Sequence, residues 1–178
     1  MPRRVFDFEW PDRFIAGTIG MPGERTFYLQ AVDGSRIASV ALEKAQVALL
    51  AERLDDLLSE IGRDGDDLAP DDNDPLSVPL EEEFRVGSLA LAWDPAQEAV
   101  VVEAHALGDE PADVGDDEVD SDAPDTLRVL VSPGEAAAFS RRARALVAAG
   151  RPPCPFCMQP LDAGGHICPR ANGYRRRA

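Results

Sequence analysis

Two stretches of the chain show the same order of patterns, three strand-like runs and then a helix-like run, and this order constrains the fold most. In the first stretch, runs rich in β-branched and aromatic residues occupy 13–20, 26–32 and 35–42. Asp33-Gly34 between two of them is a strong hairpin signal. Apolar residues then recur at helical spacing from Ala45 to Ile61, and Gly62 ends the run. The pattern predicts three strands and a helix over residues 13–62.

The second stretch repeats this order over residues 84–149. Its strand-like runs occupy 84–93, 98–107 and 126–132. The helix-like run that follows opens with Ser132-Pro133-Gly134-Glu135 and stops at Gly150. Serine caps helices, proline suits the first helical position, and a glutamate three residues after the cap completes a capping box. A second unit of three strands and a helix is therefore predicted.

The two stretches also match residue by residue. Phe14-Ile-Ala-Gly-Thr-Ile aligns with Phe84-Arg-Val-Gly-Ser-Leu, so Gly17 and Gly87 become equivalent. A glycine inside a strand often marks a bulge or a close backbone approach. We interpret the match as an internal duplication, with chance similarity of two α+β halves as the alternative. The expected fold class is α+β, in which duplicated βββα units form a two-layer domain of antiparallel sheet and helices over residues 1–149.

Two acidic segments interrupt the units, a linker at 63–80 and a loop at 108–125. Residues 64–74 contain six aspartates, residues 108–125 contain nine acidic residues, and neither run contains a basic residue. Such runs repel internally and bury little apolar surface, so we expect few contacts with the rest of the domain. Neither run has the alternating ligands and central glycine of a calcium-binding loop.

The last segment, residues 150–178, carries the most specific motif of the sequence. It reads C-x2-C-x8-H-x-C and contains Cys154, Cys157, His166 and Cys168. Zinc prefers four tetrahedral thiolate and imidazole ligands, and C-x2-C is the spacing at which a tight turn directs two sulfurs to one point. Three cysteines would leave one unpaired after any disulfide. The motif therefore predicts a structural Zn²⁺ ion, with an unligated flexible tail as the alternative.

The charge distribution limits the partners of the chain. The net charge is −15, and residues 1–149 carry 13 basic and 32 acidic side chains, a net of −19. Such a body repels nucleic acid and anionic membrane surfaces. The exception is the basic tail, whose arginines are candidates for an RNA contact; they are Arg170, Arg175, Arg176 and Arg177. No apolar run is long enough for a membrane helix or a signal peptide, which predicts a cytoplasmic protein.

Two further groups of residues are candidates for function. Phe6, Phe8 and Trp10 alternate and would share one face of a strand, either buried against the sheet or forming a partner-binding ridge. Glu103 and His105 also share a strand face, where such a pair either transfers protons or lies on a solvated surface.

The chain resembles an actinobacterial family known as a domain of unknown function (number 3090). The resemblance rests on VFDFEWPDRFIAGTIG and PGERTFYLQA near the start, on ALEKAQVALLAERL, and on the ending CPFC…GHICPRANG. The ending is also similar to half of a zinc ribbon or to a rubredoxin-like knuckle. The family resemblance implies a bacterial cytoplasmic protein, encoded near a phosphoinositide-kinase-like protein and a histidine-phosphatase-like protein.

These patterns predict a non-catalytic binding or adaptor protein with a structural zinc site and a protein partner. Two alternatives remain open. One is an enzyme, or an enzyme subunit, that acts on phosphorylated or nucleotide-like small molecules, as the implied gene neighbourhood suggests. The other is an RNA-associated factor that uses the basic tail.

Overall fold

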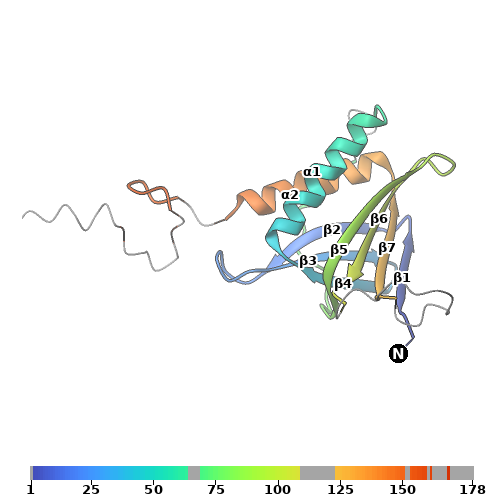
Figure 1. Cartoon of the computed structure of the whole chain (residues 1–178), viewed down its shortest axis with the longest axis horizontal. Coiled ribbons are helices and arrows are strands. Elements are labelled where there is room, and N and C mark those ends of the chain that lie inside the picture. Colours follow the sequence, from blue (N-terminus) through green and yellow to red (C-terminus); the bar gives the residue numbers. More distant parts are fainter. Residues whose placement is uncertain are drawn as a thin grey trace, which may run out of the picture.

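The computed structural model describes residues 2–63, 69–108, 123–150, 153–159, 161 and 168. Within these residues the chain forms a curled sheet with two helices packed against it (Figure 1). The strands are β1 (Val5–Glu9), β2 (Arg13–Ile19), β3 (Thr26–Asp33), β4 (Arg36–Leu42), β5 (Glu82–Asp94), β6 (Ala99–Ala106) and β7 (Thr126–Val131). The helices are α1 (Lys44–Glu60) and α2 (Pro133–Ala148). The α+β class predicted from the sequence is confirmed.

The strands form one seven-stranded sheet in the order β1-β7-β6-β5-β4-β3-β2. Both β2-β3-β4 and β5-β6-β7 are antiparallel meanders, and each is followed by a helix. The two halves thus share their element order, while the internal duplication itself stays a prediction. The prediction of an antiparallel sheet was wrong, because β5 pairs parallel to β4 and β1 pairs parallel to β7. The connection through α1 returns the chain to the end where β4 began, as parallel pairing requires.

The sheet curls until its edge strand β1 approaches β3 and the start of β4. β1 and β2 lie at opposite ends of the strand order, yet only residues 10–12 join them. Contacts across this gap support the curl. The Arg36 guanidinium donates to the backbone oxygen of Asp7 at 2.8 Å and lies 4.4 Å above the Phe8 ring. The backbone N–H of Gly34 donates to the Asp12 carboxylate at 2.8 Å. The curled sheet encloses one apolar core instead of forming a flat layer.

The helices pack on the concave side of the sheet and on each other (Figure 1). The buried residues of α1 follow helical spacing; they are Val47, Leu50, Ala51, Leu54 and Leu58. In α2, Ser132 Oγ accepts from Glu135 N and the Glu135 carboxylate accepts from Ser132 N, so the predicted capping box is confirmed. None of the helices in the described ranges is long and apolar enough to cross a membrane.

Candidate functional site

Three cysteine side chains meet after the end of α2. The Sγ atoms of Cys154, Cys157 and Cys168 all lie within 4.8 Å of one another. Those of Cys154 and Cys168 are 3.9 Å apart. Two sulfurs bound to one tetrahedral zinc, each at about 2.3 Å from the metal, lie about 3.8 Å apart. A disulfide would need about 2.05 Å, and all three cysteines are free. The spacing therefore suits a shared metal ion.

A tight turn brings the first two sulfurs together. Residues 155–157 form the turn, which the backbone closes with hydrogen bonds from Cys154 N to Gln159 O (2.8 Å) and from Met158 N to Cys154 O (2.9 Å). Met158 has a φ of 62°, a left-handed conformation uncommon outside glycine. The C-x2-C spacing thus gives the geometry that the sequence predicted.

The environment of the thiols lowers the pKa of Cys154 and raises that of Cys157, so Cys154 ionises more readily. The backbone N–H of Cys157 lowers the pKa of Cys154, and the N–H of Phe156 and the neighbouring thiols act in the same direction. For Cys157, the N–H of Gln159 lowers the pKa, but desolvation and the other two thiols together raise it. Cys154 and Cys168 are only 3% and 7% exposed. Adjacent buried thiolates repel each other, so a cation is needed to stabilise all three in ionised form.

His166, the predicted fourth ligand, lies outside the described residues, as do Arg170, Arg175, Arg176 and Arg177 of the basic tail. The structure therefore brings together three of the four residues of the motif. Ligation by His166 and nucleic-acid contact by the tail both stay predictions.

The aromatic residues near the N-terminus do not form one exposed ridge. Phe8 is 2% exposed and belongs to the core, and Phe6 is half-buried beside Phe84, with ring centroids 6.4 Å apart. Trp10 follows the end of β1 with a φ of 56°, so it leaves the alternation and is 45% exposed. Partner binding by this segment stays a prediction, which now concerns Trp10 rather than Phe6 or Phe8.

Glu103 and His105 take part in a network on the outer face of the sheet. His105 Nε2 lies 3.4 Å from the Glu103 carboxylate, and His105 Nδ1 lies 3.0 Å from Thr126 Oγ1. Arg128 reaches the other oxygen of Glu103 at 3.5 Å and Asp7 at 3.3 Å. These contacts connect β6, β7 and β1 across the sheet. They support a structural role for the pair.

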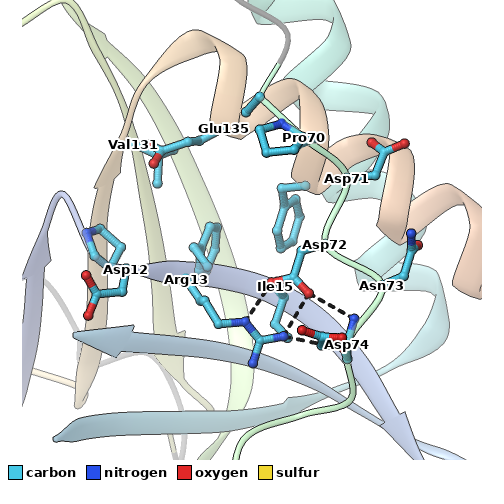
Figure 2. Close-up of a pocket in the computed structure, with 15 residues that line it drawn as sticks. Asp12, Arg13, Ile15, Pro70, Asp71, Asp72, Asn73, Asp74, Val131 and Glu135 are labelled. Carbon is cyan, nitrogen blue, oxygen red and sulfur yellow. Dashed lines mark hydrogen bonds and ion pairs between the residues drawn. The ribbon is translucent and has the colours of Figure 1, made fainter. Parts of the chain in front are cut away.

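A cavity of about 490 Å³, which sequence reasoning missed, lies between β2, α2 and the segment after α1 (Figure 2). Residues 69–77 of that segment, here named the strap, close one side of it. The expectation that the acidic linker 63–80 makes few contacts was wrong for the strap. Arg13 donates to both carboxylate oxygens of Asp72, at 2.6 and 2.9 Å, and Arg141 donates to Asp71 at 2.8 Å. Arginines from β2 and α2 supply the charge that the acidic run lacks.

The strap continues around the edge strand β2 onto the outer face of the sheet. Arg142 donates to the free edge carbonyl of Ala16 at 2.6 Å and also to the backbone of Asp72. Ser77 N donates to the Gln30 side chain at 2.7 Å, and Gln30 donates back to Ser77 O at 3.0 Å. The strap thereby covers an edge that would otherwise present unpaired backbone groups. The sequence signal for these contacts was the group of arginines in the second helix-like run, which can pair with an acidic segment.

The electrostatics of the strap centre on one ion pair. The hydrogen bond from Arg13 is the main cause that lowers the pKa of Asp72, and the same bond raises the pKa of Arg13. Burial lowers the pKa of Arg142. The pair is only partly exposed, so it is screened less than a surface ion pair.

A second hollow, of about 410 Å³, lies between α1 and β5. Leucines form its base and charged residues its rim; they are Leu49, Leu50, Leu57, Leu89 and Leu91, with Arg53, Asp56 and Glu60.

Comparison with known proteins identifies one family. The family described as "Protein of unknown function (DUF3090)" matches residues 6–168 of this chain. The matched range spans the sheet, both helices and all three cysteines, and it confirms the family that the sequence patterns indicated. No curated protein and no solved structure shows significant similarity to the chain.

Proposed function

This chain belongs to the DUF3090 family, and we propose that it is a non-catalytic binding protein whose C-terminal segment is held by one structural zinc ion. The observation that carries the proposal is the convergence of three cysteine sulfurs within 4.8 Å. Cys154, Cys157 and Cys168 would each supply one thiolate, and His166 is the proposed fourth ligand. Four protein ligands leave no open coordination position, so such an ion has a structural role.

The donor set favours zinc over an iron–sulfur cluster. The chain has three cysteines in all, whereas such clusters are usually held by four thiolates. Thiolates are soft ligands, which excludes magnesium and calcium as residents of this site. A mixed thiolate and imidazole set is typical of structural zinc.

The binding role is proposed from the side chains beside the cysteines. Phe156 and Met158 are 62% and 68% exposed, although both are large and apolar. Residues of this kind commonly anchor protein interfaces. A zinc ion that fixes the turn would hold them in place, so the proposed partner is a protein that contacts this turn.

The alternative of an enzyme for phosphorylated or nucleotide-like molecules gains no support from the cavity beside β2. Five carboxylates and one arginine line that cavity, and this excess of negative charge repels phosphate groups. The RNA alternative depends on tail residues outside the described ranges.

Metal analysis of the purified full chain tests the zinc proposal. We expect one equivalent of zinc by elemental analysis, and Co²⁺ substitution should give the absorption of a tetrahedral thiolate site. Cys157→Ser should lose most of the zinc because it removes one of four ligands. Gln159→Ser is the matched control, since it changes a neighbouring side chain that is not a ligand, and it should keep one equivalent.

Two results would reject the zinc proposal: a wild-type protein without stoichiometric zinc, or a Cys157→Ser variant that keeps a full equivalent. His166→Ser tests the fourth ligand separately and should lower zinc affinity by at least about tenfold. Unchanged affinity in this variant would exclude His166 from the site while leaving the three cysteines in place.

A further inference from the structure

The cavity between β2, α2 and the strap has an apolar floor. The rings of Phe14 and Phe139 stack there with centroids 4.6 Å apart and planes 7° apart, and Ile15, Val131 and Ala138 extend the apolar surface. Apolar floors with a few polar groups around them are typical of small-molecule sites. The faces of aromatic rings also attract cations. The floor therefore suits the apolar body of a ligand that carries positive charge.

The rim of the cavity is acidic. Its carboxylates come from the connection between β1 and β2, from the strap and from α2; they are Asp12, Asp71, Asp72, Asp74 and Glu135 (Figure 2). Asp72 and Asp71 are held by arginines, as described above. The carboxylate of Asp74, in contrast, accepts no hydrogen bond from the residues that the structure describes, although its charge acts on Arg13 and Arg142. Asp74 is thus available to a ligand.

Arg13, the arginine that lines the cavity, has no N–H group left to donate to an anion. The Arg13 guanidinium donates to Asp72, to Ser77 Oγ at 2.8 Å, and to the backbone oxygens of Asp74 and Pro75. These acceptors surround all three of its nitrogens, so the donors are already used within the protein; Figure 2 shows the contacts with Asp72 and Asp74. A negatively charged ligand would meet the carboxylates without a compensating donor.

The spread of the carboxylates favours an organic cation over a bare metal ion. Among the described residues, the three cysteines are the group of potential metal ligands whose donor atoms lie within 4.8 Å of one another, and no such group forms in this cavity. A divalent cation needs several oxygens at about 2.0–2.6 Å. The volume of about 490 Å³ instead falls within the usual range for organic ligands. An extended organic cation therefore suits the cavity better than a single ion.

We propose that this cavity binds an organic cation, in which an ammonium or guanidinium group sits at the acidic rim and an aliphatic body lies on the Phe14–Phe139 floor. The ligand is either a free small amine or the side chain of an arginine or lysine in a peptide. Both sources present the same chemistry to the cavity. None of the cysteines lines the cavity, so this site and the proposed zinc site are independent.

Isothermal titration calorimetry of the full chain with defined probes tests this proposal. The probes are agmatine, the peptide acetyl-Gly-Arg-Gly-amide, and adipate as an anion of similar length. We expect at least one of the cationic probes to bind and adipate not to bind. Asp74→Asn should weaken binding of the cationic probe by about fivefold or more, because it removes the rim carboxylate that accepts no hydrogen bond from the described residues.

Glu24→Gln is the matched control, because it removes one exposed negative charge outside the cavity. It should change affinity by less than about twofold, the effect of a distant screened charge. Tighter binding of agmatine than of the peptide assigns the free amine as the source, and the reverse assigns a peptide side chain. The proposal is overturned if neither cationic probe binds, if adipate binds equally well, or if a folded Asp74→Asn variant keeps wild-type affinity.

Discussion

Arg13 and Asp72 form one of the contacts that hold the strap against the body. Their contact places a charge-assisted hydrogen bond at the edge of the sheet, where the side chains are 22% and 30% exposed. The bond lowers the pKa of Asp72. A depressed carboxyl pKa stabilises the folded state above the pKa of the unfolded chain, about 3.9, and this contribution disappears as the pH falls through the folded-state pKa.

Asp72→Asn should therefore lower the free energy of unfolding at pH 7 by roughly 1–3 kcal/mol, since it breaks a partly buried charged contact. The difference from wild type should begin to shrink below about pH 3.9, where the unfolded chain takes up the proton, and should vanish only below the lowered pKa of folded Asp72. Urea denaturation at pH 7 and at pH 3 measures both values. Asp71→Asn is the control: Asp71 is 59% exposed and pairs with Arg141 at the surface, so its loss should cost less than about 1 kcal/mol. Equal losses in both variants at pH 7 would contradict the role given to Asp72.

The two strand glycines, Gly17 and Gly87, give a prediction at the same scale. A Cβ atom at Gly87 would lie 2.8 Å from the backbone Cα of Leu107, at the register shift of β5 between Val86 and Ser88. At Gly17 the nearest atoms, at 2.5 Å, belong to the side chain of Leu76. Gly87→Ala should cost more stability than Gly17→Ala, by about 1 kcal/mol or more, because a side chain can move and a paired backbone cannot. Chemical denaturation of both variants decides this, and a larger loss in Gly17→Ala would contradict it.

Among the elements, α2 begins where its sequence predicts because the capping groups are local. Ser132 Oγ accepts from Glu135 N at 3.2 Å, and Ser132 N donates to the Glu135 carboxylate at 2.9 Å. Ser132→Ala should reduce the free energy of unfolding by about 1 kcal/mol, the usual loss for a helix cap. Ser59→Ala, at an exposed position in α1, is the control and should change stability by less than about 0.5 kcal/mol. A loss in Ser132→Ala no larger than in the control would show that Glu135 alone suffices at this end.

At the scale of the whole molecule, the ends of the acidic loop at 108–125 are fixed while residues 109–122 lie outside the described ranges. Ala106 N donates to Asp125 O at 2.8 Å, and Arg4 contacts the Asp125 carboxylate at 2.8 Å. Deletion of residues 110–122 should shift the melting temperature by no more than about 3 °C, because shortening a loop between fixed ends changes closure entropy little. Differential scanning calorimetry measures the shift. A fall of more than about 10 °C would show that the loop stabilises the fold.

The sequence by itself determined what depends on neighbours along the chain. The periodicity of the sequence predicted six of the seven strands and both helices. The Ser132–Glu135 pair predicted the start of α2. The C-x2-C spacing predicted the turn that brings Cys154 and Cys157 together. These features rest on hydrogen bonds and dihedral angles that span only a few residues, so local residue types suffice to specify them.

Only the tertiary structure decided which distant segments pair. The parallel pairing of β1 with β7, the curl that brings Arg36 over Phe8, and the contact of Asp72 with Arg13 join residues far apart in the chain. The acidic linker illustrates the reason. Its own composition predicts repulsion, and arginines of β2 and α2, which only the fold brings close, neutralise that charge. The cavity beside the strap exists for the same reason, because its walls come from segments that meet only in the folded chain.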